Sequence, residues 1–252
     1  MLVRQLEIGA GRPKICVSVT GRDENEVLEQ LKQVKASRAD LTEWRVDYYT
    51  NVSELEKVGT LLCTMREVLQ DMPLLFTFRT KEEGGEREIS PQDYEQLNLY
   101  AAKSGYVDLI DVELEKTDKG IAKMRQELDQ RQELKVYITA SYHDFQKTPP
   151  VQEMVERLEK MKEQGAHIVK LAVMPQCRQD VINLMEASLK VQGEVPVITM
   201  SMGEMGRISR VAGGLTGSAV TFGAVGEVSA PGQIECDRLH QMLCWVNGNV
   251  II

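Results

Sequence analysis

The sequence lacks the features that mark membrane proteins, nucleic-acid-binding proteins and disulfide-rich secreted proteins. None of its apolar runs is long enough to span a bilayer, and the N-terminal residues carry charges where a signal peptide has an apolar core. The formal net charge of −8 argues against a nucleic-acid partner, which requires a basic surface. The five cysteines are scattered, odd in number and without a CxxC pair, so we expect free thiols. These absences predict a cytoplasmic protein with neither a membrane nor a nucleic-acid partner.

The usual signatures of bound metals and dinucleotides are missing as well. The chain has only three histidines, and none of them takes part in an HExxH pair or in another metal-ligand spacing. No GxGxxG segment follows the first apolar run, which weakens the case for a dinucleotide site. We therefore predict neither a metal nor an organic cofactor.

Short apolar runs alternate with amphipathic segments along nearly the whole chain. The runs cover residues 14–20, 41–48, 74–80, 107–114, 136–143, 168–174, 195–202 and 219–225. Helical segments are expected at 24–35, 54–69, 92–103 and 151–164, with Asp23 and Ser90 as N-caps. Eight strand–helix units in 252 residues favour a single α/β domain of the (β/α)8 (TIM) barrel type over a doubly wound open sheet. Residues 1–13 are expected to form an N-terminal β-hairpin that caps the barrel.

Charged and polar side chains recur on one face of five consecutive strands. Side chains alternate along a strand, so each run can be divided into two faces. The apolar face must meet the helices, which turns the other face into the barrel; it carries Glu43, Arg45, Asp47, Thr77, Arg79, Asp111, Glu113, Thr139, Ser141, His143 and Lys170. A purely structural barrel would hold Val, Ile and Leu there. Each buried charge without a partner would lower the stability of the fold by roughly several kcal/mol. The pattern predicts an active site at the C-terminal ends of the strands.

Lys170 lies in an otherwise apolar run, where burial disfavours an ammonium ion. A lysine in that setting either reaches water with its head group or acts as a Schiff-base nucleophile. Arg45 and Arg79 would further oppose its protonation. His143 ends the preceding strand and is a candidate general acid and base. We interpret the other two histidines, His167 and His240, as structural.

The chain resembles the type I 3-dehydroquinate dehydratase (3-dehydroquinase) family over essentially its full length. The matching segments, in the family's order, are 43–47 (EWRVD), 78–79 (FR), 83–86 (EGGE), 141–145 (SYHDF), 169–172 (VKLA), 208–210 (ISR) and 229–233 (SAPGQ). The resemblance implies a lyase of the shikimate pathway that acts on 3-dehydroquinate as a homodimer.

By the same resemblance, Lys170 forms a Schiff base with the C3 ketone, and His143 acts as acid and base in a syn elimination of water. Glu83 would orient His143, although Glu86 competes for this role on spacing alone. Arg210 would bind the substrate carboxylate, with Ser229 and Gln233 at the same end and residues 227–233 as a lid. The ring hydroxyls would be bound by Ser18, Glu43, Arg45 and Arg79.

Two alternatives remain at this stage. A class I Schiff-base aldolase shares the barrel, the lysine and the acid–base partner, and the glycines near residues 213–217 could serve its phosphate. A barrel kept only as a binding module would have lost the lysine or the histidine, and both are present.

Overall fold

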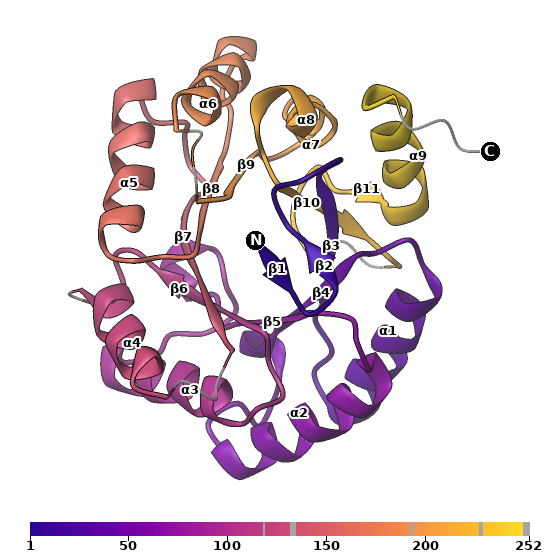
Figure 1. Cartoon of the computed structure of the whole chain (residues 1–252), viewed down its shortest axis with the longest axis vertical. Coiled ribbons are helices and arrows are strands. Elements are labelled where there is room, and N and C mark those ends of the chain that lie inside the picture. The colour runs from indigo at the N-terminus through magenta and orange to yellow at the C-terminus, as the bar shows by residue number, and fades with distance from the viewer. Residues whose placement is uncertain (118, 132–134, 192, 194, 227–228, 249–252) are drawn as a thin grey trace.

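The computed structural model describes residues 1–117, 119–131, 135–191, 193, 195–226 and 229–248, and its centre is a curled parallel sheet (Figure 1). Eight strands follow the chain around the sheet: β3 (Lys14–Val19), β4 (Leu41–Arg45), β5 (Leu74–Thr77), β6 (Leu109–Glu113), β7 (Tyr137–Asp144), β8 (Ile168–Val173), β9 (Val197–Ser201) and β10 (Val220–Ala224). The short strand β11 (Ile234–Glu235) adds to β10 on its other side. The predicted barrel is confirmed, and β11 is an addition that the sequence did not reveal.

The barrel closes between β9 and β10, where one backbone hydrogen bond and one hydrogen bond to a side chain connect the two segments. The N–H of Ala219 donates to the carbonyl of Val197 at 2.7 Å. The Oγ atom of the preceding residue, Ser218, accepts from the N–H of Thr199 at 3.0 Å. These bonds satisfy backbone groups that would otherwise be buried without a partner.

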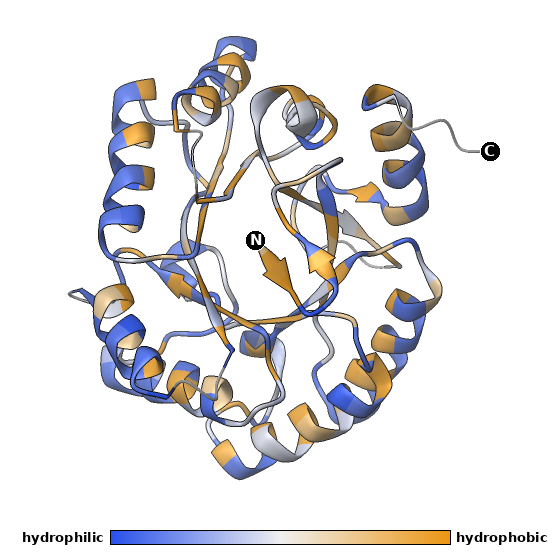
Figure 2. Ribbon diagram, viewed as in Figure 1, coloured by the Kyte–Doolittle hydropathy of each residue, from blue (hydrophilic) through white to orange (hydrophobic). Residues whose placement is uncertain are grey.

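Helices surround the sheet, with their hydrophobic residues toward the strands and hydrophilic ones outward (Figure 2). Ser90 and Asp23 accept the N3 backbone N–H groups as predicted N-caps. Among the described residues, no helix is both long and apolar enough to cross a membrane. The helices are α1 (Glu24–Ala36), α2 (Leu55–Leu69), α3 (Pro91–Lys103), α4 (Gly120–Asp129), α5 (Val151–Glu163), α6 (Arg178–Lys190), α7 (Arg207–Val211), α8 (Gly213–Thr216) and α9 (Cys236–Val246).

The predicted N-terminal hairpin is formed by β1 (Leu2–Val3) and β2 (Leu6–Glu7). Val3 and Ile8 are fully buried, and they belong to one apolar cluster with residues at the N-terminal ends of the barrel strands: Leu41, Leu75, Leu109 and Ile168. The hairpin therefore covers the N-terminal end of the barrel, and the opposite end is left for the charged residues.

Two strands end about three residues before the predicted runs do, whereas the other strand ends differ from the prediction by at most two residues. The run 41–48 leaves the sheet after Arg45 and continues as the 3₁₀ turn η1 (Val46–Tyr48), and β5 ends at Thr77. The side chain of Asp47 explains both ends, because it accepts the backbone N–H of Arg79 at 3.2 Å and that of Glu86 at 3.1 Å. The Asp47 carboxylate thus binds backbone N–H groups that could otherwise have bonded to a neighbouring strand.

Candidate active site

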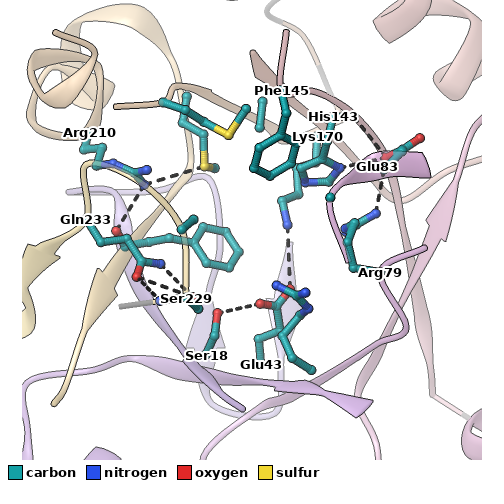
Figure 3. A pocket seen from close by; sticks show the side chains of 17 residues that line it. Ser18, Glu43, Arg79, Glu83, His143, Phe145, Lys170, Arg210, Ser229 and Gln233 are labelled. Atoms are coloured by element: carbon teal, nitrogen blue, oxygen red, sulfur yellow. Dashed lines mark hydrogen bonds and ion pairs between the residues drawn. The ribbon is translucent and has the colours of Figure 1, made fainter. Parts of the chain in front are cut away.

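The structure gathers all ten residues predicted for catalysis and binding in one pocket at the C-terminal ends of the strands (Figure 3). They come from seven of the eight barrel strands or the loops that follow them, which explains why they are far apart in sequence. The pocket is lined by Ser18, Glu43, Arg45, Arg79, Glu83, Gly84, His143, Phe145, Lys170, Ala172, Met200, Met202, Arg210, Phe222, Ser229, Ala230 and Gln233. Among the described residues, no cluster of three or more His, Cys, Asp or Glu could hold a metal ion.

The Lys170 side chain is buried, 5% exposed, and its nitrogen points into the pocket (Figure 3). Carboxylate oxygens of Glu43 and Asp111 lie 3.7 and 3.8 Å from Nζ, and the ring centre of Phe222 lies 4.3 Å away. The sequence indicated two arginines that would oppose the protonation of Lys170, and the structure adds two carboxylates within 4 Å of its nitrogen. Arg45 is itself paired with Asp47 through two hydrogen bonds of 2.8 Å, so its charge is balanced.

Arg79 is the centre of a buried ionic network. Its guanidinium donates to Asp111 and to Glu113 at 2.8 Å each, to Ser141 at 3.0 Å and to Glu83 at 3.4 Å. Burial opposes the charge, yet the neighbouring carboxylates raise the pKa of Arg79 well above its usual value. Arg79 thus stays charged and fixes several acidic side chains around the pocket.

His143 is held from one side by Glu83. Oε2 of Glu83 accepts the backbone N–H of His143 at 3.0 Å and lies 2.9 Å from Nδ1, so Nε2 is the ring nitrogen left for a substrate. Burial lowers the pKa of His143 well below its usual value, and the charge of Arg79 lowers it further. Burial and the charge of Glu113 raise the pKa of Glu83. At neutral pH His143 is therefore an uncharged imidazole, able to accept a proton. Glu86, the alternative partner, instead pairs with Arg22 at 3.3 Å on the surface.

Glu43 is fixed by two hydroxyl groups beneath the lysine. Ser18 donates to Oε2 at 2.5 Å, and Thr77 donates to Oε1 at 2.9 Å. Burial opposes the ionisation of Glu43, but the charges of Lys170 and Arg45 prevail and lower its pKa. The floor of the pocket therefore presents an anionic acceptor.

Arg210 lies on the opposite side of the pocket and is 1% exposed. It donates to the carbonyls of Phe222 at 3.3 Å and Pro231 at 3.1 Å, and no carboxylate of the described residues pairs with it. Burial lowers the pKa of Arg210 to about 10. Near it, the amide of Gln233 donates to Ser229 at 2.9 Å (Figure 3). Residues 227 and 228 of the predicted lid lie outside the described residues.

A model of the type I 3-dehydroquinase family matches residues 15–249. The chain belongs to this family. It is 46% identical over 244 residues to a 3-dehydroquinate dehydratase of Clostridioides difficile strain 630, covering 96% of this chain and 94% of the relative. A solved structure of the Clostridium difficile type I enzyme superposes with a TM-score of 0.94 at 43% identity, covering 99% of this chain and 98% of the other. A Geobacillus kaustophilus 3-dehydroquinate dehydratase gives the same TM-score at 34% identity, with 100% and 97% covered.

The apolar side of this family member's pocket was not predicted. Phe145, Met200, Met202 and Phe222 line it together with small residues. Met200, Met202 and Phe222 lie on or just beyond β9 and β10, in the apolar cluster that fills the barrel interior. The division into faces used for the five charged strands would have turned Met200, Met202 and Phe222 toward the helices, because they lie on the more apolar face of these two runs.

Proposed function

We propose that this chain removes water from 3-dehydroquinate to give 3-dehydroshikimate, through a Schiff base on Lys170 with His143 as general acid and base. The observation that carries the proposal is the meeting of three groups in one pocket. These are the buried amine of Lys170, the uncharged imidazole of His143 and the guanidinium of Arg210, which pairs with no carboxylate of the described residues. The family match favours this dehydration over the aldolase alternative. A cytoplasmic location and a homodimer remain predictions.

The first step joins Lys170 to the substrate. The amine attacks the C3 ketone, the ketone oxygen leaves as water, and the resulting iminium carries a positive charge at the former Nζ. This covalent electron sink makes the neighbouring C2 proton removable. The Clostridium difficile structure, described as containing covalent modified comenic acid, supports covalent chemistry in a site of this family.

His143 performs the proton transfers of the second step. Its free Nε2 takes the C2 proton while Glu83 holds Nδ1, and the same nitrogen returns the proton to the C1 hydroxyl as it leaves. The bond electrons form the C1=C2 double bond, so the product imine is conjugated. Water then releases the ketone product and the free lysine. A positioned acid–base group of this kind contributes ~10²–10⁴ in rate.

Arg210 is proposed to bind the substrate carboxylate. Among the described residues, its two terminal nitrogens contact only neutral acceptors, which are backbone carbonyls and the Met200 sulfur, so an acid would gain a charge-assisted pair there. Ser229 and Gln233 lie at the same end and would hold the acid from the loop after β10. Four residues on the other side would bind the ring hydroxyls: Ser18, Glu43, Arg45 and Arg79.

The test is borohydride trapping with 3-dehydroquinate, followed by digestion and mass spectrometry. We expect a reduced adduct on Lys170 and none in Lys170→Ala. Lys162→Ala removes another shielded lysine, outside the pocket, and should keep the adduct. His143→Ala should still form the adduct but turn over at least ~10²-fold more slowly. An active Lys170→Ala, or a wild-type protein without adduct or turnover, would refute the proposal.

A further inference from the structure

Asp111 is buried beside Lys170, behind the residues that line the pocket, and neither the sequence pattern nor the proposed reaction gives it a role of its own. We propose that Asp111 is the counter-ion that keeps the imine on Lys170 protonated. This inference rests on the proposed function, because the imine must form for its protonation to matter.

The two oxygens of Asp111 differ in their surroundings. Oδ1 accepts hydrogen bonds from Arg79 at 2.8 Å and from Ser141 at 2.6 Å. Oδ2 is buried, makes no hydrogen bond with any described residue, and lies 3.8 Å from Nζ of Lys170. An unpaired buried carboxylate oxygen is costly, so a donor at the lysine nitrogen would satisfy it. The side chain is thus held by one oxygen and directed at the reacting nitrogen by the other.

Glu43 is the other carboxylate near Nζ, but both of its oxygens are already engaged by Ser18 and Thr77. In the proposed reaction it also receives a substrate hydroxyl. Asp111 lies deeper, is fully buried, and does not line the pocket surface. Its charge therefore remains available to the nitrogen when the ring fills the pocket.

Once the amine of Lys170 becomes a protonated imine, its charge is stabilised best by a single acceptor in a fixed position. An ammonium ion has three N–H donors that can turn toward several partners, whereas an iminium has one N–H in a fixed plane. A carboxylate near that N–H stabilises the cation by an amount that increases in a poorly solvated site. Loss of the proton would remove the electron sink on which the elimination depends.

The other titratable groups near Nζ do not substitute for Asp111. Arg45 and Arg79 are cations paired with carboxylates, His143 is neutral, and burial raises the pKa of the Cys16 thiol so that it stays uncharged. Glu113 resembles Asp111 in its 2.8 Å bond to Arg79, but the described contacts join it to Arg79 and Thr80 and not to Lys170. Glu113 is therefore a matched control that shares the ionic network without the lysine contact.

The experiment follows the absorbance of the conjugated imine formed with 3-dehydroshikimate as pH is raised, since its protonated form absorbs at longer wavelength. The carboxylate favours the cation, so the protonated band is present at low pH and disappears as pH rises. We expect Asp111→Asn to lose the band about 1–3 pH units below wild type. Glu113→Gln should titrate like wild type.

Two further variants keep the test decisive. Ser141→Ala frees Oδ1 of Asp111 from a hydrogen bond without removing a charge, and it should move the loss of the band to higher pH. If Glu43→Gln lowers the titration and Asp111→Asn does not, Glu43 is the counter-ion and the inference is overturned. An unchanged titration in both Asp111→Asn and Ser141→Ala overturns it as well. Absence of any imine in wild type would instead refute the proposed function.

Discussion

The two most buried arginines of the pocket differ in what balances their charge. Arg79 donates to three carboxylates, whereas Arg210 donates to two carbonyl oxygens and a sulfur. Burying a cation without a neighbouring carboxylate lowers the free energy of unfolding, because the charge loses its hydration. The same loss of hydration lowers the pKa of Arg210 to about 10. Arg79 therefore contributes to the stability of the structure, and the proposed anion binding would explain why Arg210 is retained at a cost.

Arg210→Met should separate stability from function. Methionine has a similar length and removes the desolvation cost, so we expect the free energy of unfolding to rise by about 1 kcal/mol. The same change removes the proposed partner of the substrate carboxylate, so KM for 3-dehydroquinate should rise at least ~10-fold. Urea denaturation and steady-state kinetics measure the two effects.

Arg79→Met is the matched comparison. It leaves Asp111, Glu113 and Glu83 buried without their common cation, so we expect a loss of about 3–5 kcal/mol of stability. If both arginine variants were destabilised equally, the distinction between a cation balanced by carboxylates and one without them would be contradicted.

Single residues show how far sequence reasoning reaches. Alternation along strands was enough to place Glu43, His143 and Lys170 inside the barrel. It could not choose between Glu83 and Glu86, because both lie in a loop after β5 whose course depends on the bonds of Asp47. Nor could it show that carboxylates outnumber free arginines around Lys170, since that depends on pairings across four strands.

At the scale of elements, hydrophobic periodicity located all eight barrel strands but not their ends. The run 41–48 looks continuous in sequence, yet the chain turns at Val46 once the Asp47 carboxylate binds backbone N–H groups of the next loop. Strand β11 has only two residues, too few for a period to be recognised. Strand ends and short strands are set by tertiary hydrogen bonds, which explains why the local pattern missed them.

The turn at Pro231 and Gly232 is the element that places Arg210 and the loop after β10. The Pro231 carbonyl accepts from Arg210 and from the N–H of Gly203, each at 3.1 Å. Gly232 has a φ of +79°, and a Cβ there would lie 2.1 Å from the Gly203 oxygen. We expect Gly232→Ala to displace this turn and raise KM, because Ser229 and Gln233 would move with it.

Gly105→Ala is the control for the Gly232 variant. Gly105 has a similar φ of +78° but open space at its Cβ position, so it reports backbone strain without a clash. Both variants should lose about 1–3 kcal/mol from the strained conformation, and only Gly232→Ala should change KM. Equal KM values for the two variants would show that the turn does not organise the binding site.

The whole molecule divides its tasks between the two ends of the barrel. Charged residues gather at the C-terminal ends of the strands, where they make the pocket, and the N-terminal end is filled with aliphatic side chains under the β1–β2 hairpin. Oδ2 of Asp111 and Nε of Arg210, two buried polar atoms with no hydrogen-bond partner among the described residues, lie at the first end, where barrel enzymes hold their active sites. The second end has to supply the stability that the pocket costs.

Substitutions in the hairpin should therefore change stability without changing catalysis. Ile8 is fully buried in the cluster that closes the barrel, so Ile8→Ala should lower the free energy of unfolding by about 2–5 kcal/mol. Leu2, on the same hairpin, is 61% exposed, and Leu2→Ala should stay within about 0.5 kcal/mol of wild type. Because the pocket lies at the other end, kcat and KM of folded Ile8→Ala should match wild type below its unfolding temperature. A fall in kcat that exceeds the unfolded fraction would show that the two ends are coupled through the barrel interior.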